Sequence, residues 1–277
     1  MSLNRAVPSA SYGITMREEA SDEVSLLAEQ IRMYGFGVLD AGFTPQQTES
    51  ISAAFDVVHQ GYLEIHGLDN LTAINEHNTI RCPLSLAIDP FKALVFNENL
   101  TMLLKQLIRG AFILSQQNGI INPPQKEYNQ AAWHRDLPYQ HFVSSSPLAI
   151  NALYCVDEFT LENGSTYVLP GTHKTEAFPT SEFVERNAQQ VVAKAGQYLV
   201  LDCMTFHAGG FNSSSAPRRA VNHLFTIPMF KQQIAFANAV DATQFTVEQQ
   251  KILGIPYAEA QGVDAYLRSR PRPSRGG

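Results

Sequence analysis

The pattern of apolar and polar positions predicts a helical opening to the chain. Over residues 15–34, apolar side chains recur at helical spacing among acids and amides, which indicates an amphipathic helix that ends at Gly35. A short apolar run at residues 36–40 predicts a strand, and Thr44 followed by Pro45 marks the start of a second helix. This helix–strand–helix opening is expected to buttress a sheet that forms later in the chain.

The middle of the chain is less regular. Residues 66–90 contain loop formers, and Pro83 and Pro90 interrupt any long element there. One helix is expected over residues 90–109, because leucines recur along one of its faces. A first strand region then begins near residue 111 and ends in a turn by Pro124.

Short strands separated by turn residues dominate the second half of the chain. A turn at Asn163-Gly164 predicts that a strand over residues 165–169 returns antiparallel to a strand over residues 149–156. Further elements are expected as a helix at 180–188 and strands at 191–193, 197–202 and 219–230. This succession of short strands favours a β-sandwich or barrel.

Length and composition describe one ordinary globular domain. The chain has 277 residues, of which 44% are hydrophobic and 17% charged, and it shows no internal repeat or dividing linker. We expect a single domain over residues 1–277. Residues 1–15 are expected to form a loose arm, and residues 268–277, rich in Arg, Pro, Ser and Gly, a disordered tail.

Charge and cysteine content narrow the class of function. The net charge of −6 argues against a nucleic-acid partner. No apolar run approaches the ~18 residues that a membrane span needs, so no membrane partner is expected. The three cysteines, Cys82, Cys155 and Cys203, have no paired spacing and suit a reducing compartment. A cytoplasmic location is therefore expected, whereas the oligomeric state stays open.

The sequence contains a candidate metal site. His134 and Asp136 lie two residues apart, which on an extended strand places both side chains on the same face. Two imidazoles and one carboxylate form the facial triad that binds non-haem Fe(II) and leaves three positions open. His207, at the exit of a predicted strand, is the candidate for the second imidazole. Each of these signals is weak alone, because H-x-D arises often by chance.

An arginine that is a candidate for cosubstrate binding follows His207 in the sequence. Arg218 comes eleven residues later, after Asn212 and Pro217. A planar guanidinium near a metal matches the distal carboxylate of a dicarboxylate cosubstrate in a two-pronged contact. Arg219 would face the opposite way on an alternating strand, so no role in cosubstrate binding is expected for it.

Taken together, these motifs resemble the phytanoyl-CoA dioxygenase family of Fe(II)/2-oxoglutarate oxygenases. The resemblance runs from about residue 23 to residue 230. It is carried by His134-Arg135-Asp136-Leu137, by the run from Glu162 to Lys174 that contains Asn163-Gly164 and Pro170-Gly171-Thr172-His173, by the run from Ala195 to Asp202, and by His207 with Asn212 and Arg218.

The resemblance implies a fold and a set of cofactors. The fold would be mainly β, a cupin-like double-stranded β-helix or jelly roll with flanking N-terminal helices. Fe(II) would be held by His134, Asp136 and His207, with 2-oxoglutarate anchored by Arg218 and O2 as the oxidant. Related halogenases carry Gly or Ala in place of the carboxylate, which opens a site for chloride, so Asp136 favours hydroxylation or desaturation.

Three positions depart from the family pattern. Many members carry a hydroxyl two residues after the distal histidine, where this chain has Gly209. Leu153 replaces an aromatic residue on the strand before the Asn-Gly turn. Arg81 is expected to take the place of a basic residue that some members use as a second cosubstrate contact. The first two changes are expected to weaken 2-oxoglutarate binding without changing the reaction.

The expected function is that of an Fe(II)- and 2-oxoglutarate-dependent dioxygenase that hydroxylates a small polar organic metabolite and releases succinate and CO2. The substrate could also be an acyl-CoA thioester, a sugar, an amino-acid derivative or a natural-product intermediate. The expected pocket residues combine aromatic and polar groups: Trp133, Tyr139, Gln140, His141, Asn151 and Tyr154. Desaturation, epimerisation or ring formation at the same site is one alternative. A jelly-roll binding module without catalytic activity is the other.

Overall fold

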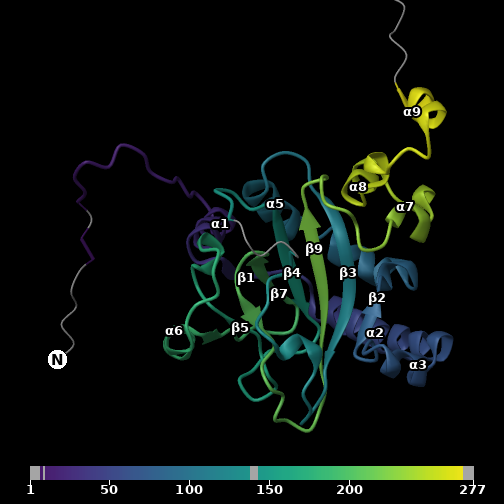
Figure 1. Cartoon of the computed structure of the whole chain (residues 1–277), viewed down its shortest axis with the longest axis horizontal. Coiled ribbons are helices and arrows are strands. Elements are labelled where there is room, and N and C mark those ends of the chain that lie inside the picture. The colour runs from purple at the N-terminus through teal and green to yellow at the C-terminus, as the bar shows by residue number, and fades with distance from the viewer. Residues whose placement is uncertain (1–6, 9, 138–142, 271–277) are drawn as a thin grey trace, which may run out of the picture.

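Two antiparallel sheets form the centre of the molecule (Figure 1). The computed structural model describes residues 7–8, 10–137 and 143–270. The larger sheet has the strand order β1-β7-β4-β9-β3-β2, and the smaller has the order β6-β5-β8. The strands are β1 Phe36–Asp40, β2 Thr79–Arg81, β3 Ile113–Asn122, β4 Ala149–Cys155, β5 Tyr167–Val168, β6 Gln189–Gln190, β7 Gln197–Asp202, β8 His207–Ala208 and β9 Arg218–Thr226.

The two sheets face each other, and their facing sides form an inner layer. Val168 of β5 packs in one cluster with Leu199 and Leu201 of β7. This confirms the expected double-stranded β-helix with flanking helices, although the sheets do not close into a barrel. The expected pairing of residues 165–169 is wrong, because β5 pairs with β6 and β8 of the smaller sheet and not with β4.

Helices from the first part of the chain cover the outer face of the larger sheet. In Figure 1 they are the purple and blue ribbons beside and behind the strands. Tyr198 of β7 donates a hydrogen bond to the carbonyl oxygen of Leu94, 2.9 Å away, and so ties the sheet to a helix. The helices are α1 Glu23–Tyr34, α2 Pro45–His66, α3 Leu68–Ala73, α4 Ile88–Val95, α5 Glu98–Leu107, α6 Ser181–Asn187, α7 Phe236–Ala239, α8 Val247–Ile252 and α9 Val263–Ser269.

Capping residues decide where these helices begin and end. Helix α1 starts at residue 23, later than expected, because the side chain of Asp22 accepts a hydrogen bond from the amide of Ser25. It ends, as expected, at Gly35, whose φ of 86° is a left-handed conformation that favours glycine. Thr44 and Gln47 form a capping box at the start of α2.

The expected single helix over residues 90–109 is in fact two helices. Helix α4 ends at Val95, and the side chain of Asn97 then accepts a hydrogen bond from the amide of Leu100 to begin α5. The segment 66–90 also contains the short helix α3, which the loop formers there concealed. At the other end of the chain, α9 reaches Ser269, so the expected tail overlaps a helix.

Strand β9 is the central element for the site. It pairs with β4 on one side and with β3 on the other. It ends at Thr226, earlier than the expected end at residue 230, and Pro228 follows soon after. Because side chains alternate along a strand, every second residue from Arg218 to Thr226 faces the smaller sheet.

Among the helices of the described ranges, none is long and apolar enough to cross a bilayer.

The outward face of β9 carries a neutral histidine. His223 is fully buried, its Nδ1–H donates to the carbonyl oxygen of Ala152 at 3.0 Å, and its Nε2 accepts from the side-chain amide of Gln117 at 3.0 Å. Protonation of Nε2 would turn this acceptor into a donor that faces the amide hydrogens of Gln117, which is unfavourable. Burial lowers the pKa of His223 to about 4, below its ordinary value of 6.5.

We therefore expect stability to depend on pH through His223. Its pKa is lower in the folded state, so the unfolded chain takes up the proton first. The free energy of unfolding should fall as the pH drops from about 6.5 towards 4, by about 3 kcal/mol from this group. Denaturant unfolding of wild type and His223→Gln across this range measures the effect. The variant should show a shallower pH dependence, and equal slopes would contradict the assignment.

Candidate active site

A backbone bridge brings the two candidate histidines together. The amide of His134 donates to the carbonyl oxygen of His207 at 3.0 Å, and the amide of His207 donates back at 3.1 Å. The two imidazole rings consequently lie side by side, with their centroids 4.3 Å apart. Two segments distant in the sequence thus present their side chains at one place.

The carboxylate of Asp136 completes a three-residue cluster. The amide of Asp136 donates to the carbonyl oxygen of Cys203 at 3.1 Å, which fixes its segment against the turn after β7. One carboxylate oxygen lies 3.7 Å from Nε2 of His207. Each of His134, Asp136 and His207 offers a ligand atom, and these atoms lie within 4.8 Å of one another. The structure thus brings together all three residues that the sequence selected.

Backbone carbonyl groups set the orientation and the tautomer of both imidazoles. Nδ1 of His134 lies 2.7 Å from the carbonyl oxygen of Ala132, and Nδ1 of His207 lies 3.0 Å from that of Thr205. Nδ1–H is the donor in each contact, so Nε2 keeps the lone pair that a metal needs. Burial lowers the pKa of His207, which favours the neutral imidazole, more than the neighbouring Asp136 raises it.

The side chain of Asn151 orients the carboxylate. Its amide nitrogen donates to Oδ2 of Asp136 at 2.8 Å. This contact holds one oxygen in place and leaves Oδ1 beside His207. Asn151 stands on the inner face of β4, so a rigid sheet supports the position of Asp136.

A narrow cavity joins this cluster to Arg218. It is lined by inward side chains of β4, β9 and β3 together with the three cluster residues. Arg218 is only 3% exposed, and its guanidinium lies over the ring of Phe159, 4.1 Å from the ring centroid. Nη1 donates to the carbonyl oxygen of Gly164, whereas the buried Nε has no partner.

Arg218 therefore presents a buried cation without a counter-charge. Within the part of the chain that the structure describes, no carboxylate forms an ion pair with it. Burial accordingly lowers the pKa of the guanidinium. An anion entering the cavity would remove this penalty, which is strongest where water is excluded.

Arg219 lies on the other face of β9, as strand alternation predicts. Its guanidinium pairs with Asp157 at 2.7 Å and with Asp56 at 2.6 Å. These contacts tie β9 to the start of the loop after β4 and to α2. Arg219 thus has its own anionic partners away from the narrow cavity.

Arg81 does not reach the narrow cavity. Its Nε donates to Glu76 at 2.9 Å, and Nη1 donates to the side-chain oxygen of Gln233 at 3.4 Å. Arg81 lies on the edge strand β2, where its strand partner is Asn118 of β3. The strand partner of Arg218, at one end of β9, is Asn122 of β3. The two arginines that the sequence assigned to one cosubstrate are therefore not brought together.

The expected substrate residues separate into different environments. Asn151 lines the narrow cavity. Tyr154 lies on the opposite face of β4, fully buried against Tyr198 and Phe43. Tyr139, Gln140 and His141 lie outside the described residues.

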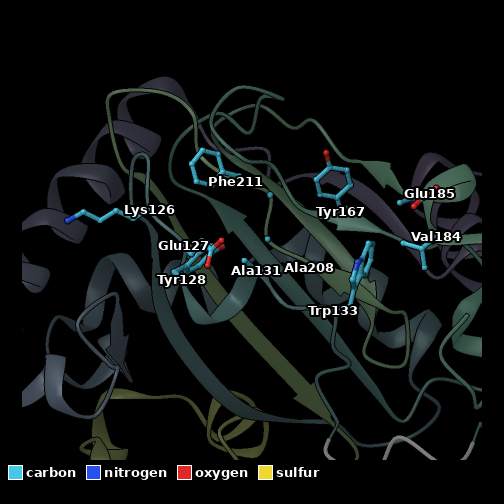
Figure 2. A pocket seen from close by; sticks show the side chains of 13 residues that line it. Lys126, Glu127, Tyr128, Ala131, Trp133, Tyr167, Val184, Glu185, Ala208 and Phe211 are labelled. Carbon is cyan, nitrogen blue, oxygen red and sulfur yellow. The ribbon is translucent and has the colours of Figure 1, made fainter. Parts of the chain in front are cut away.

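Trp133 lines a separate cavity on the outer side of the smaller sheet. Figure 2 shows Trp133 and Tyr167 at this cavity of about 490 Å³, together with Phe211. The ring centroids of Trp133 and Tyr167 are 6.4 Å apart. Since Trp133 directly precedes His134, it points away from the cluster, as neighbouring residues of an extended segment do.

The structure also reveals a chamber that the sequence did not predict. It measures about 750 Å³ and is lined by Asp136 together with mostly apolar side chains. Leu224 and Thr226 contribute from the inward face of β9, and the side-chain oxygen of the buried Thr226 has no partner. Period-two alternation from Arg218 along β9 could have found both residues. The remaining lining residues are Ser115, Gln116, Leu137, Leu148, Ile227, Met229, Phe230, Lys231 and Gln233.

Comparison with known families identifies the class. The family model of phytanoyl-CoA dioxygenase (PhyH) matches residues 31–220, a stretch that contains the three cluster residues and Arg218. The chain belongs to this family, as the motifs predicted. It is thus an oxidoreductase of the Fe(II)/2-oxoglutarate-dependent dioxygenase class, with 2-oxoglutarate and O2 as cosubstrates. The alternative of a binding module without catalytic activity is set aside.

Individual proteins and a solved structure are also similar to this chain. Protein Rv1501 of Mycobacterium tuberculosis, whose function is uncharacterized, is 31% identical over 266 residues, which cover 92% of this chain and 88% of the relative. Dioxygenase af480 of Aspergillus fumigatus is 29% identical over 139 residues, or 47% of this chain and 42% of the relative. The structure of EctD from S. alaskensis with 2-oxoglutarate and 5-hydroxyectoine is similar with a TM-score of 0.60 and 20% identity, covering 76% of this chain and 80% of that one.

The contact between Asn151 and Asp136 generates a testable prediction. Asn151→Ala removes the amide that orients the carboxylate, and loss of such an outer contact weakens metal binding by about 10-fold or more. Titration of the metal-free protein with Fe(II) under anaerobic conditions, or with Co(II), measures the affinity. Tyr154→Phe, on the other face of the same strand, is the matched control and should bind metal as wild type does. Equal affinity in wild type and Asn151→Ala would contradict this role.

Proposed function

We propose that this chain hydroxylates a small organic molecule, with Fe(II) held by His134, Asp136 and His207 and the distal carboxylate of 2-oxoglutarate held by Arg218. One observation carries the proposal: the three-residue cluster and a buried guanidinium without a counter-charge line the same narrow cavity. A metal at one end and a cation at the other suit a ligand that chelates through one end and carries a carboxylate at the other.

The donor set fits Fe(II). Two neutral imidazoles and one carboxylate form a facial triad, which leaves positions open for a cosubstrate and O2. The carbonyl groups of Ala132 and Thr205 set the tautomers, and Asn151 holds the carboxylate. When bound, the iron centre supplies the oxidative decarboxylation of 2-oxoglutarate to succinate and CO2, coupled to insertion of the second oxygen atom of O2 into a C–H bond.

Arg218 orients the cosubstrate and selects a dicarboxylate. Its guanidinium is stacked on Phe159 and fixed through Gly164, so its remaining N–H groups are positioned before the ligand arrives. The low exposure of this site strengthens the ion pair that forms with a carboxylate. A monocarboxylic 2-oxo acid would leave the cation unpaired and is expected to bind weakly.

The chamber beside Asp136 is the place that we assign to the substrate. Its apolar walls, which include Leu137, Leu148 and Leu224, suit an apolar body. Thr226 and Gln233 provide polar contacts at its edge, so the expected small polar metabolite becomes an amphipathic small molecule in this proposal.

The net charge of −6 disfavours a nucleic-acid substrate. The protein is proposed to act in the cytoplasm.

Loss of the metal tests the function directly. His207→Ala removes one of three ligands and should abolish both Fe(II) retention and 2-oxoglutarate-dependent release of succinate, while the fold stays intact by circular dichroism. Iron content and succinate are measured on the same samples, since succinate release reports the reaction before the substrate is known. Undiminished iron content in a folded His207→Ala protein would refute the assignment. Product mass then distinguishes gain of one oxygen atom from desaturation, epimerisation or ring formation.

The two adjacent arginines provide a test with an internal control. Arg218→Ala leaves a buried carboxylate unpaired and should weaken 2-oxoglutarate binding by roughly 2–5 kcal/mol, or at least tens-fold, with iron binding nearly unchanged. Arg218→Lys should recover only part of the loss, because an ammonium group cannot make the two-pronged contact.

Arg219→Ala is the matched control, because its partners are Asp157 and Asp56 on the other face of the strand. It is expected to change stability and to leave 2-oxoglutarate binding near the wild-type value. A large effect at Arg219 with none at Arg218 would show that the cosubstrate lies elsewhere.

A further inference from the structure

The side chain of Tyr128 lies between the outer cavity and the narrow cavity and lines both. Figure 2 shows it from the outer side, beside Glu127 and near Ala131. The segment that carries it is fixed to the exit of β8, because the amide of Gly209 donates to the carbonyl oxygen of Gln130 at 2.7 Å. The ring therefore forms part of the wall behind the narrow cavity.

The hydroxyl of Tyr128 occupies the space of a missing side chain. A Cβ atom placed on Gly209 would lie 2.2 Å from this hydroxyl and 2.9 Å from the ring carbon that bears it. The backbone of Gly209 does not need glycine for its conformation, since its φ is not in the left-handed region. Glycine is needed here for space, because the tyrosine ring packs directly against the backbone.

This hydroxyl also lies near Arg218. The two side chains line the same narrow cavity, and the charge of the guanidinium acts on the phenol. A guanidinium has donors only, so it cannot accept the phenol proton. The phenol proton is then left to donate elsewhere, and no acceptor for it lies within hydrogen-bond distance among the described residues.

Burial keeps this phenol neutral. It raises the pKa of Tyr128, and the charge of Arg218 beside it offsets that shift only in part. A neutral phenol beside an arginine keeps its O–H, which is one donor to offer to an incoming anion.

We propose that Tyr128 is a second anchor for 2-oxoglutarate, with its O–H donating to the distal carboxylate that Arg218 binds. This inference rests on the proposed function of the narrow cavity. Arg218 and Tyr128 would together contact both oxygens of the carboxylate, the first as a cation and the second as a neutral donor. The weaker 2-oxoglutarate binding expected from Gly209 is thereby offset, because a residue from another segment places a hydroxyl at that position.

Tyr128→Phe tests the proposal with little change in packing, since the ring remains against Gly209. Affinity is measured by anaerobic titration of the Fe(II)-loaded protein with 2-oxoglutarate, followed through the visible absorption band of the chelate. Loss of a hydrogen bond to a charged group should raise Kd by about 10- to 100-fold. Fe(II) affinity should be unchanged. In turnover, the KM for 2-oxoglutarate should rise while kcat changes little, because the contact is present before and during the reaction.

Tyr167→Phe is the matched control. Tyr167 lines the outer cavity as Tyr128 does, but it is absent from the lining of the narrow cavity. Removing its hydroxyl should leave the Kd for 2-oxoglutarate unchanged. An equal rise in both variants would attribute the effect to the outer cavity and overturn the proposal.

A rescue experiment separates hydrogen bonding from structural damage. Tyr128→Ala should weaken 2-oxoglutarate binding and also create space beside Gly209. Adding Gly209→Ser in this background places a hydroxyl there, and it should recover part of the affinity, whereas Gly209→Ala in the same background should not. In the presence of Tyr128, Gly209→Ser should instead lower stability through the clash. No difference between the Ser and Ala variants would contradict the proposal.

The outcomes distinguish this inference from the proposed function. If Arg218→Ala raises Kd and Tyr128→Phe does not, the second anchor is wrong and the cosubstrate site stands. If wild-type protein loaded with Fe(II) develops no chelate band with 2-oxoglutarate, the proposed function itself fails.

Discussion

The backbone bridge between His134 and His207 is the interaction on which the rest of the site depends. It pairs a segment before β4 with the short strand β8, and each histidine donates to and accepts from the other. Because side chains alternate along extended chain, a slip of one residue would turn an imidazole away from the cavity and put Trp133 or Ala208 in its place. The amide of Asp136 donates to the carbonyl oxygen of Cys203, outside this antiparallel register, and so holds the carboxylate beside the two imidazoles.

The second constraint is the buried charge of Arg218. The inner face of β9 carries this cation at one end and Leu224 and Thr226 at the other, so the strand lines the narrow cavity with a charge and the chamber with less polar groups. A guanidinium without a carboxylate partner is unfavourable in the folded protein. The large core between the outer face of the sheet and the helices, which includes Phe55, Phe91 and Phe225, supplies the stability that such a site requires.

Local signals in the sequence were sufficient for many elements and for the motif residues. Strands at residues 36–40 and 197–202, the start of α2 at Pro45 and the stop at Gly35 all follow from periodicity and capping chemistry. The predicted elements are wrong where contacts between residues distant in the sequence decide the structure. Asn97, the residue that caps the start of α5, also donates a hydrogen bond to the carbonyl oxygen of Ala41. Strand β5 pairs with β6 and β8 of the smaller sheet. Tyr154 was expected beside Asn151 although an odd separation on one strand puts them on opposite faces.

What the sequence by itself determined is the chemical identity of the site: two imidazoles, one carboxylate and an arginine, with spacings that a known family shares. Spacing along a strand also determined that Arg218 and Arg219 face opposite ways, because alternation is a local property of extended backbone. Tertiary structure alone decided that Arg81 pairs with Glu76 outside the cavity, that a chamber opens beside Asp136, and that Tyr128 fills the space at Gly209. The chamber and the contact at Gly209 are formed by segments that are distant in the sequence, and local spacing carries no signal for them. They depend on where the packing of two sheets and their covering helices leaves room for each side chain.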